Sequence, residues 1–161
     1  MNKIISLQQA ITISKKLKAE DKTTVLVGGC FDIFHYGHFV FLKKAKNLGD
    51  ILIVALESDK KVRELKGKGR PITPLRARAE ILAAFFFIDY ILLLPYFPDD
   101  KSYNNLAIGL QPDIIATTAG DLQLVKKQKQ AESVGGKVVI IPHIDTPSTS
   151  EILEIIKKEN N

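Results

Sequence analysis

The sequence predicts a single α/β domain, residues 1–161, built on a doubly wound sheet of five parallel strands. Three observations support this class. Short apolar runs of strand length alternate with segments of helical periodicity, the alternation continues along the whole chain, and no linker or internal repeat interrupts it. Ligands of such sheets bind beyond the carboxyl ends of the strands, where helices begin. Candidate functional residues are therefore expected at those junctions.

Each element has a local signal. Ser6 and Gln9 form a capping-box pattern ahead of a helix at residues 7–19, so residues 1–20 are expected to pack on the domain as an N-terminal helix. Strands are expected at residues 23–27, 51–56, 90–94, 113–116 and 137–141, and further helices at 36–47, 73–87, 102–109, 122–133 and 148–158. Thr73 and Pro74 supply a hydroxyl N-cap and a first-turn proline. The basic run at residues 60–70, which contains two glycines, is expected to form a mobile loop.

Composition excludes several classes of protein. With 45% hydrophobic and 25% charged residues, the chain is neither disordered, collagen-like nor a coiled coil. The single cysteine, Cys30, excludes an internal disulfide framework and fits a cytoplasmic protein. The longest apolar stretch, residues 81–95, is interrupted by Asp89 and is shorter than the roughly 20 residues that span a bilayer, so no membrane association is expected. A net charge of +5 suits an anionic ligand.

The most informative segment joins a buried strand to a helix, and it reads Gly28-Gly29-Cys30-Phe31-Asp32-Ile33-Phe34-His35-Tyr36-Gly37-His38. Its two histidines fall in the first helical turn, where free backbone N–H groups and the helix dipole attract anions and imidazoles can donate to phosphate oxygens. Gly37 leaves room for a ligand to approach the backbone. Two other interpretations are a pair of polar helix-start residues, and a zinc site completed by Cys30 or Asp32, which lacks patterned third and fourth ligands.

The pattern Gly-x-Phe-Asp-x-x-His-x-Gly-His in this segment resembles the first signature of the cytidylyltransferase-like nucleotidyltransferases. Their second signature, a hydroxyl cluster that opens the last helix, resembles Ser148-Thr149-Ser150. Between them, Leu65-Lys66-Gly67, Arg70-Pro71, Pro74-Leu75 and Arg78 resemble the adenylyltransferase domain of bifunctional heptose-phosphate synthases. The resemblance covers essentially the whole chain, so we expect a stand-alone transferase without the kinase half.

This resemblance implies a Rossmann-like nucleotidyltransferase fold and a reaction. A nucleoside monophosphate would pass from an NTP, ATP being favoured, to a phosphorylated sugar such as heptose 1-phosphate, with release of pyrophosphate. Mg²⁺ would be carried by the nucleotide phosphates rather than by a protein metal site, and the protein would be a homodimer. The implied catalytic residues are His35, His38, Lys66 and Arg78; the nucleotide-binding residues are Gly28, Gly29, Cys30, Phe31, Asp32, Gly37, Asp121, Ser148, Thr149 and Ser150; the substrate-binding residues are Arg70 and Asp32.

Several alternatives stay open. Ser148 with Glu151 is also a capping box, and Asp32 suits a turn cap, a water-mediated Mg²⁺ contact or a contact to a substrate hydroxyl. His143 stands where glycerol-phosphate cytidylyltransferases have an arginine, which leaves the acceptor and the base open. Glycerol-3-phosphate cytidylyltransferase and FAD synthase are therefore alternatives within the class, and a non-catalytic nucleotide sensor lies outside it. A nucleic-acid-binding module is disfavoured because aromatic residues do not interleave the basic ones.

Overall fold

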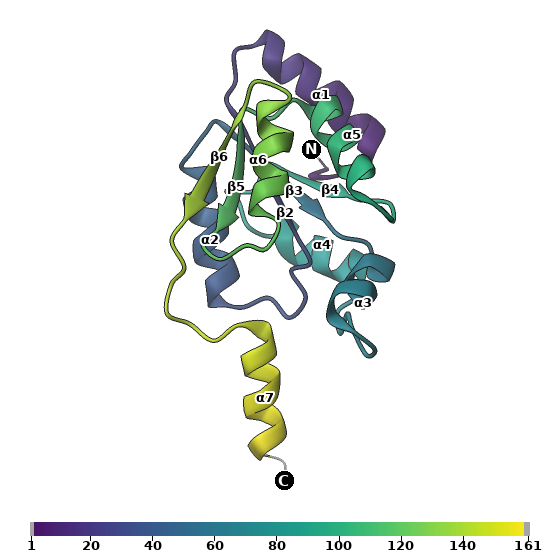
Figure 1. Cartoon of the computed structure of the whole chain (residues 1–161), viewed down its shortest axis with the longest axis vertical. Coiled ribbons are helices and arrows are strands. Elements are labelled where there is room, and N and C mark those ends of the chain that lie inside the picture. The colour runs from purple at the N-terminus through teal and green to yellow at the C-terminus, as the bar shows by residue number, and fades with distance from the viewer. Residues whose placement is uncertain (1, 160–161) are drawn as a thin grey trace.

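The protein is described by a computed structural model that covers residues 2–159. Its centre is a six-stranded parallel sheet in the order β1-β4-β3-β2-β5-β6, with helices on both faces (Figure 1). The doubly wound class is confirmed, but the predicted number of five strands is wrong by one. The additional strand, β1 (Ile4–Ile5), lies at the sheet edge and pairs in parallel with β4 (Tyr90–Leu93). Two residues are too few for a periodic pattern to reveal a strand.

The remaining strands are β2 (Thr24–Gly29), β3 (Ile51–Leu56), β5 (Ile114–Thr118) and β6 (Lys137–Ile141). The chain moves outward from β2 through β3 to β4, and then crosses to the opposite side of β2 for β5 and β6. The carboxyl ends of β2 and β5 therefore flank the topological switch point, where doubly wound sheets form a crevice.

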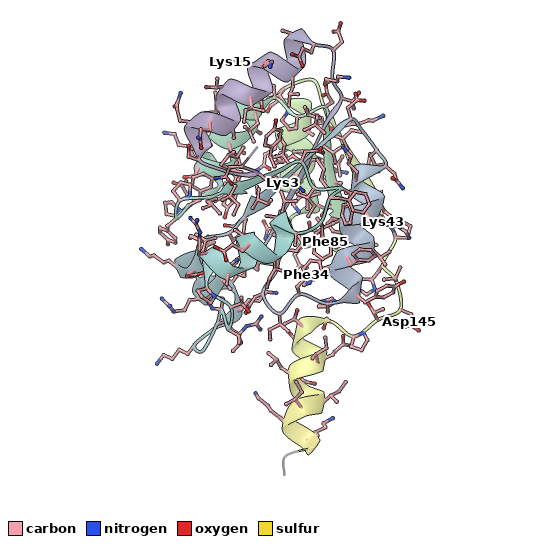
Figure 2. The ribbon with its side chains drawn as sticks, turned by 180° about the vertical axis from the view of Figure 1, so that it is seen from behind. Lys3, Lys15, Phe34, Lys43, Phe85 and Asp145 are labelled. Carbon is pink, nitrogen blue, oxygen red and sulfur yellow. The ribbon has the colours of Figure 1, made fainter. Side chains whose placement is uncertain are left out.

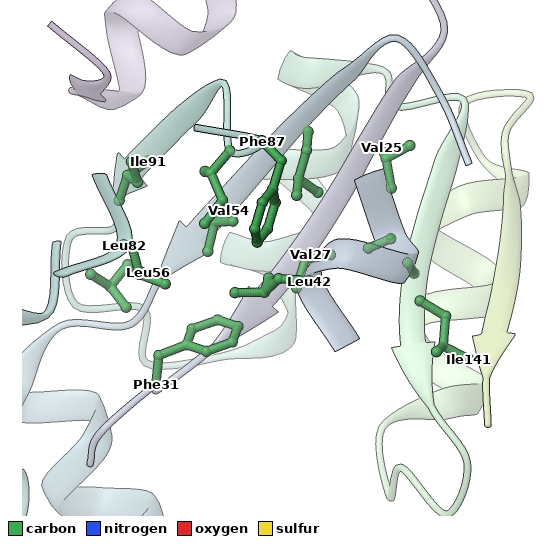
Figure 3. Packing of buried hydrophobic residues seen from close by; sticks show 14 of the residues in the cluster. Val25, Val27, Phe31, Leu42, Val54, Leu56, Leu82, Phe87, Ile91 and Ile141 are labelled. Carbon is green, nitrogen blue, oxygen red and sulfur yellow. The ribbon is translucent and has the colours of Figure 1, made fainter. Parts of the chain in front are cut away.

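Alternation along the central strands divides the core into two layers. Val25 and Val27 of β2 face the layer under α2 (Tyr36–Lys46) and α4 (Leu75–Ala83), which Figure 3 shows. Leu26, between them, faces the layer under α1 (Leu7–Ala19), α5 (Asp100–Leu110) and α6 (Leu124–Glu132). Because both faces are covered, the strands are apolar on both sides, as their continuous hydrophobic runs predicted.

The first helix, α1, starts as predicted. The Ser6 hydroxyl accepts a hydrogen bond from the Gln9 backbone N–H, and the Gln9 side chain accepts one from the Ser6 N–H at 2.8 Å. The helix then packs against α5 on the outside of the sheet (Figure 1).

The basic run differs from its prediction. Residues Asp59–Lys66 form a helix, α3, so the loop begins only at residue 67 and continues to residue 74. The helix is capped by Ser58, whose side chain accepts the Lys61 N–H at 3.3 Å, and it is anchored by the buried Val62. The many charges of the segment hid this short helix, because a single apolar anchor makes no visible period.

The helix α4 also differs at both ends. Pro74, not Thr73, occupies its N-cap position, and the helix ends at Ala83 rather than near residue 87. The three phenylalanines that follow lie outside the helix: Phe87 is buried in the core, whereas Phe86 is 89% exposed.

Candidate active site

A cavity of about 590 Å³ opens at the carboxyl ends of β2, β5 and β6, beside the N-termini of α2 and α7 (Thr149–Glu159). It lies beyond the carboxyl ends of the strands, as the sequence predicted, and at the switch point of the sheet. The cavity brings together nearly all the predicted site residues, and these are Gly28, Gly29, Cys30, Phe31, Asp32, His35, Gly37, His38, Lys66, Arg70, Asp121, Ser148, Thr149 and Ser150. The exception is Arg78, which does not line it.

The two histidines sit side by side at the start of α2, with ring centroids 3.9 Å apart. His35 is the N-cap residue, and its Nδ1 accepts the backbone N–H of Gly37 at 3.1 Å. This bond leaves Nε2 as the protonated nitrogen of the neutral His35 ring. A Cβ at Gly37 would lie 2.9 Å from both the His35 ring and the Thr146 hydroxyl, so glycine is required for this close approach.

His38 lies deeper, packed edge-on against Phe31 and tilted against Phe34, at centroid distances of 5.2 and 5.5 Å. Phe34 in turn packs on Phe85, and the two are labelled close together in Figure 2. Burial, reinforced by the nearby His35 and Lys66, lowers the pKa of His38 to about 4. Its Nδ1 is buried and has no hydrogen-bond partner within residues 2–159. The ring is therefore neutral at pH 7 and holds an unused polar atom.

The lowered pKa of His38 predicts a pH-dependent stability. Between pH 4 and 6.5 the unfolded chain binds a proton at this residue that the folded chain does not, so acidification favours unfolding. His38→Gln removes this titrating group. Its effect on the free energy of unfolding should therefore be about 1–2 kcal/mol more favourable at pH 5 than at pH 7.5. Urea unfolding of both proteins at the two pH values measures this difference. Equal effects of the substitution at both pH values would contradict the buried neutral imidazole.

Asp32 organises the loop after β2. It is 2% exposed, and its carboxylate accepts hydrogen bonds from Arg70 Nε at 2.5 Å and from the backbone N–H groups of Ile72 and Thr73 at 3.0 and 2.9 Å. Burial by itself would raise the pKa of Asp32, but the bonds from Thr73, Ile72 and Arg70 together lower it. Of the alternatives for Asp32, the structure shows the turn-capping one, whereas a contact to Mg²⁺ or to a substrate hydroxyl stays a prediction.

The prediction that Arg78 contacts phosphate is corrected by the structure. Arg78 is 1% exposed, and its guanidinium donates to the backbone carbonyls of Thr73, Cys30 and Glu57 and to the Asp59 carboxylate. These acceptors belong to three segments, which are the loop after β2, the junction of β3 with α3, and the loop before α4. Arg78 is consequently a positioning residue that fixes the cavity wall, and it has no exposed donor for a ligand.

Three lysines also line the cavity: Lys66, which the sequence predicted, and Lys44 and Lys127, which it did not. Lys66, the last residue of α3, is exposed at the cavity rim. Lys127, from α6, donates to Asp121 at 2.6 Å, and Asp121 also accepts the Gln123 N–H at 2.8 Å. Burial would raise the pKa of Asp121, but Lys127, Thr117 and Gln123 hold it below its ordinary value. A basic residue one turn into the helix after Gly120-Asp121 was the available signal for Lys127.

The second motif meets the first across the cavity. The Thr149 hydroxyl donates to the Asp32 carbonyl at 3.2 Å, which links the start of α7 directly to the histidine segment. Ser148 and Glu151 form the reciprocal capping box, with the Ser148 N–H donating to Glu151 at 2.6 Å. Beyond this contact α7 extends away from the sheet (Figure 1). The capping role is thus shown, and the hydroxyls still line the cavity.

Alanine substitutions separate the two roles of this motif. As a cap, Ser148→Ala should cost about 0.5–2 kcal/mol of stability and leave NTP binding normal in the folded protein. If the cluster also holds phosphate, Thr149→Ala or Ser150→Ala should raise the KM for NTP severalfold. Thermal melting with and without NTP measures both effects, because stabilisation by a ligand follows its Kd. Unchanged NTP binding in all three variants would restrict the motif to a structural role.

A metal site built by the protein alone is not visible. Within the described part of the chain, no group of three or more His, Cys, Asp or Glu residues is arranged to hold a metal ion. Cys30 is a free, half-buried thiol whose pKa is raised by burial and then by Glu57. Between residues 2 and 159 there is also no helix with the length and apolar character needed to cross a membrane.

Comparison with known proteins identifies the family. The model of the cytidylyltransferase-like family matches residues 26–159, most of the chain. This chain belongs to the cytidylyltransferase-like family. The match spans both predicted motifs, and it confirms the family that those motifs indicated.

Relatives of this cytidylyltransferase-like chain include proteins named "Bifunctional protein HldE". The one from Campylobacter jejuni subsp. doylei is 40% identical over 155 residues, and the one from Geobacter sulfurreducens is 39% identical over 143 residues. These alignments cover 96% and 88% of this chain but 32% and 28% of the relatives, so the chain spans about one third of their length. The predicted resemblance to one domain of a bifunctional protein is confirmed, and the comparisons support a nucleotidyltransferase enzyme.

Two solved structures share the fold. A lipopolysaccharide core biosynthesis protein from Thermoplasma volcanium is 26% identical, with a TM-score of 0.62 over 78% of this chain and 99% of its own. A pantoate-beta-alanine ligase from Francisella tularensis is 17% identical, with a TM-score of 0.65 over 96% of this chain and 76% of its own. The second likeness concerns the fold alone.

Proposed function

We propose that this protein transfers a nucleoside monophosphate from an NTP, with ATP favoured, to a phosphorylated sugar of the heptose 1-phosphate type, and releases pyrophosphate. One observation carries the proposal. The histidine pair at the start of α2 and the hydroxyl cluster at the start of α7 line the same 590 Å³ cavity, in contact through Thr149 and Asp32. Two helix N-termini and a histidine pair at one cavity are suited to a polyphosphate. The HldE relatives support a sugar phosphate as acceptor.

In the proposed reaction an acceptor phosphate oxygen attacks the α-phosphorus of the NTP. The new P–O bond forms as the bond from the α-phosphorus to the bridging oxygen breaks, and pyrophosphate leaves with the electron pair. A phosphate oxygen is already nucleophilic at pH 7, so the protein has to position both substrates and stabilise the developing charge.

The residues divide this work by their positions. His35 and His38 would donate to the α-phosphate and bridging oxygens, and the incoming negative charge would raise the low pKa of His38. Ser148, Thr149 and Ser150 would hold the leaving pyrophosphate at the start of α7. Lys66 would neutralise the acceptor phosphate, together with Arg70, which Asp32 holds at the wall of the same cavity.

The chemistry of the carboxylates argues against a metal ion held by the protein. Asp32 and Asp121, which line the cavity, each accept hydrogen bonds from a basic side chain and from backbone N–H groups. We therefore propose that Mg²⁺ arrives on the nucleotide phosphates, its usual mode in such sites.

We further propose that the protein is a cytoplasmic homodimer. The half-buried free thiol of Cys30 suits a reducing compartment, and exposed Phe86 offers apolar surface to a second copy.

The test is a matrix of four NTPs against heptose 1-phosphate, glycerol 3-phosphate and FMN, read by pyrophosphate release. We expect ATP with heptose 1-phosphate to give the highest kcat/KM. Highest activity for CTP with glycerol 3-phosphate, or for ATP with FMN, would replace the proposed acceptor and keep the reaction. If nucleotides bind but none of the tested pairs releases pyrophosphate, the protein is a nucleotide sensor and the proposal is overturned.

A further inference from the structure

A second cavity, of about 290 Å³, adjoins the main one on the face of the sheet that α5 and α6 cover. The two cavities share wall residues at the end of β2, where Gly28, Gly29 and Cys30 line both. Leu65 at one rim and Lys127 at the other are also common to both. The two cavities therefore adjoin at the end of β2, so that a molecule in the main cavity lies next to the second one.

One buried carboxylate stands out in this second cavity. Glu57 directly follows β3, is 8% exposed, and contributes its backbone carbonyl to the Arg78 network. Its Oε1 accepts the Tyr103 hydroxyl at 2.9 Å, but its Oε2 is buried and has no hydrogen-bond partner in residues 2–159. An unpaired buried carboxylate oxygen is costly, and native structures rarely contain one without a reason.

The surroundings of Glu57 select the chemistry of a ligand. The cavity wall is apolar at Leu26, Leu94 and Leu106, and Lys61 and Lys127 line it as well. Burial raises the pKa of Glu57, while Tyr103 and the lysines oppose that shift. Asp100, Lys126, Gln123 and Gln130 line it too, so the cavity combines an apolar wall with polar groups that can set specificity, as small-molecule sites do.

We propose that this second cavity holds the hydroxyl-bearing part of the acceptor, with Glu57 Oε2 accepting a sugar hydroxyl and Tyr103 fixing the carboxylate. The inference rests on the proposed function and names the group that reads the acceptor. In the main cavity, the N-termini of α2 and α7 would bind the triphosphate. Thr118 and His143, at the ends of β5 and β6, line the part of the same cavity that would hold the nucleoside. The second cavity is what remains for a polyol whose phosphate must reach Lys66.

The variants Glu57→Gln and Tyr103→Phe test this assignment. Calorimetric titration with heptose 1-phosphate and with inorganic phosphate separates recognition of the hydroxyls from recognition of the phosphate, and titration with ATP reports on the nucleotide site. We expect each variant to weaken heptose 1-phosphate binding about tenfold or more, and to leave phosphate and ATP binding within twofold of wild type. Glu80→Gln is the matched control, because Glu80 lines neither cavity and its side chain pairs with Arg76 on the exposed face of α4. It should change none of the three affinities.

Other outcomes overturn the proposal in distinguishable ways. If Glu57→Gln weakens ATP binding instead, the second cavity holds the nucleobase. If neither variant changes heptose 1-phosphate binding, or if wild type does not bind it, the cavity does not read this acceptor. Tyr103→Phe keeps the test decisive should Glu57→Gln fail to fold, since it retains the buried carboxyl. Normal acceptor binding without pyrophosphate release would refute the proposed reaction while leaving the cavity assignment intact.

Discussion

Replacing His38 by alanine is expected to lower kcat by about 10²–10³, the effect of removing one donor aimed at developing charge. The ring lies in the main cavity, 3.9 Å from His35, with one buried nitrogen that no residue of the described chain uses. Because the contact strengthens only as charge develops, the Kd for NTP should change much less than kcat. Single-turnover pyrophosphate release and calorimetric NTP binding measure the two quantities.

His35 requires a more careful substitution, because its Nδ1 also caps α2. His35→Ala should lose both the catalytic donor and about 0.5–2 kcal/mol of stability, whereas His35→Asn should retain much of the cap and still lose the donor. Comparable losses of kcat in both variants, with a smaller loss of stability in His35→Asn, would separate the roles. Near-normal turnover in His35→Asn and in His38→Ala would refute the proposed mechanism.

Replacing Arg78 by methionine is expected to reduce the free energy of unfolding by about 3–5 kcal/mol, because three backbone carbonyls lose their donor at roughly 1–3 kcal/mol each. The substitution leaves the Asp59 carboxylate without its buried partner and three carbonyls without their donors. Those carbonyls belong to the segments that carry Cys30, Glu57 and Thr73, so the walls of both cavities should shift. Urea unfolding measures the loss of stability.

Arg76 on the same helix provides the control for Arg78. Its pairing with Glu80 is exposed, so Arg76→Ala should change stability by no more than about 0.5 kcal/mol. Arg78→Lys keeps the charge but not the planar fork of donors. Its loss of unfolding free energy should lie between those of Arg76→Ala and Arg78→Met. A stability of Arg78→Met within 1 kcal/mol of wild type would contradict the buried network, and a normal KM for both substrates would contradict its role in shaping the cavities.

The sequence predicted much of this protein because its signals are local. Strand β6 has its predicted limits, and the capping boxes at Ser6 and Ser148 form as their spacing indicated. The placement of the cavity at the carboxyl ends of the strands follows from the alternation of strands and helices along the chain, whereas the strand order that sets the switch point comes from the structure. The two motifs identified the family, and the residues they contain do meet at one cavity.

Only the tertiary structure decided what each charged side chain does. Asp32 and Arg70 lie 38 positions apart, and nothing in either neighbourhood shows that one neutralises the other. Arg78 has the sequence context of a surface cation on an amphipathic helix, yet the loops after β2 and β3 and the loop before α4 close over it. The unpaired Glu57 oxygen is likewise a property of packing. Local pattern fixes which elements form and where strands end, whereas partners distant in sequence determine whether a charge there is free for a ligand or committed to the fold.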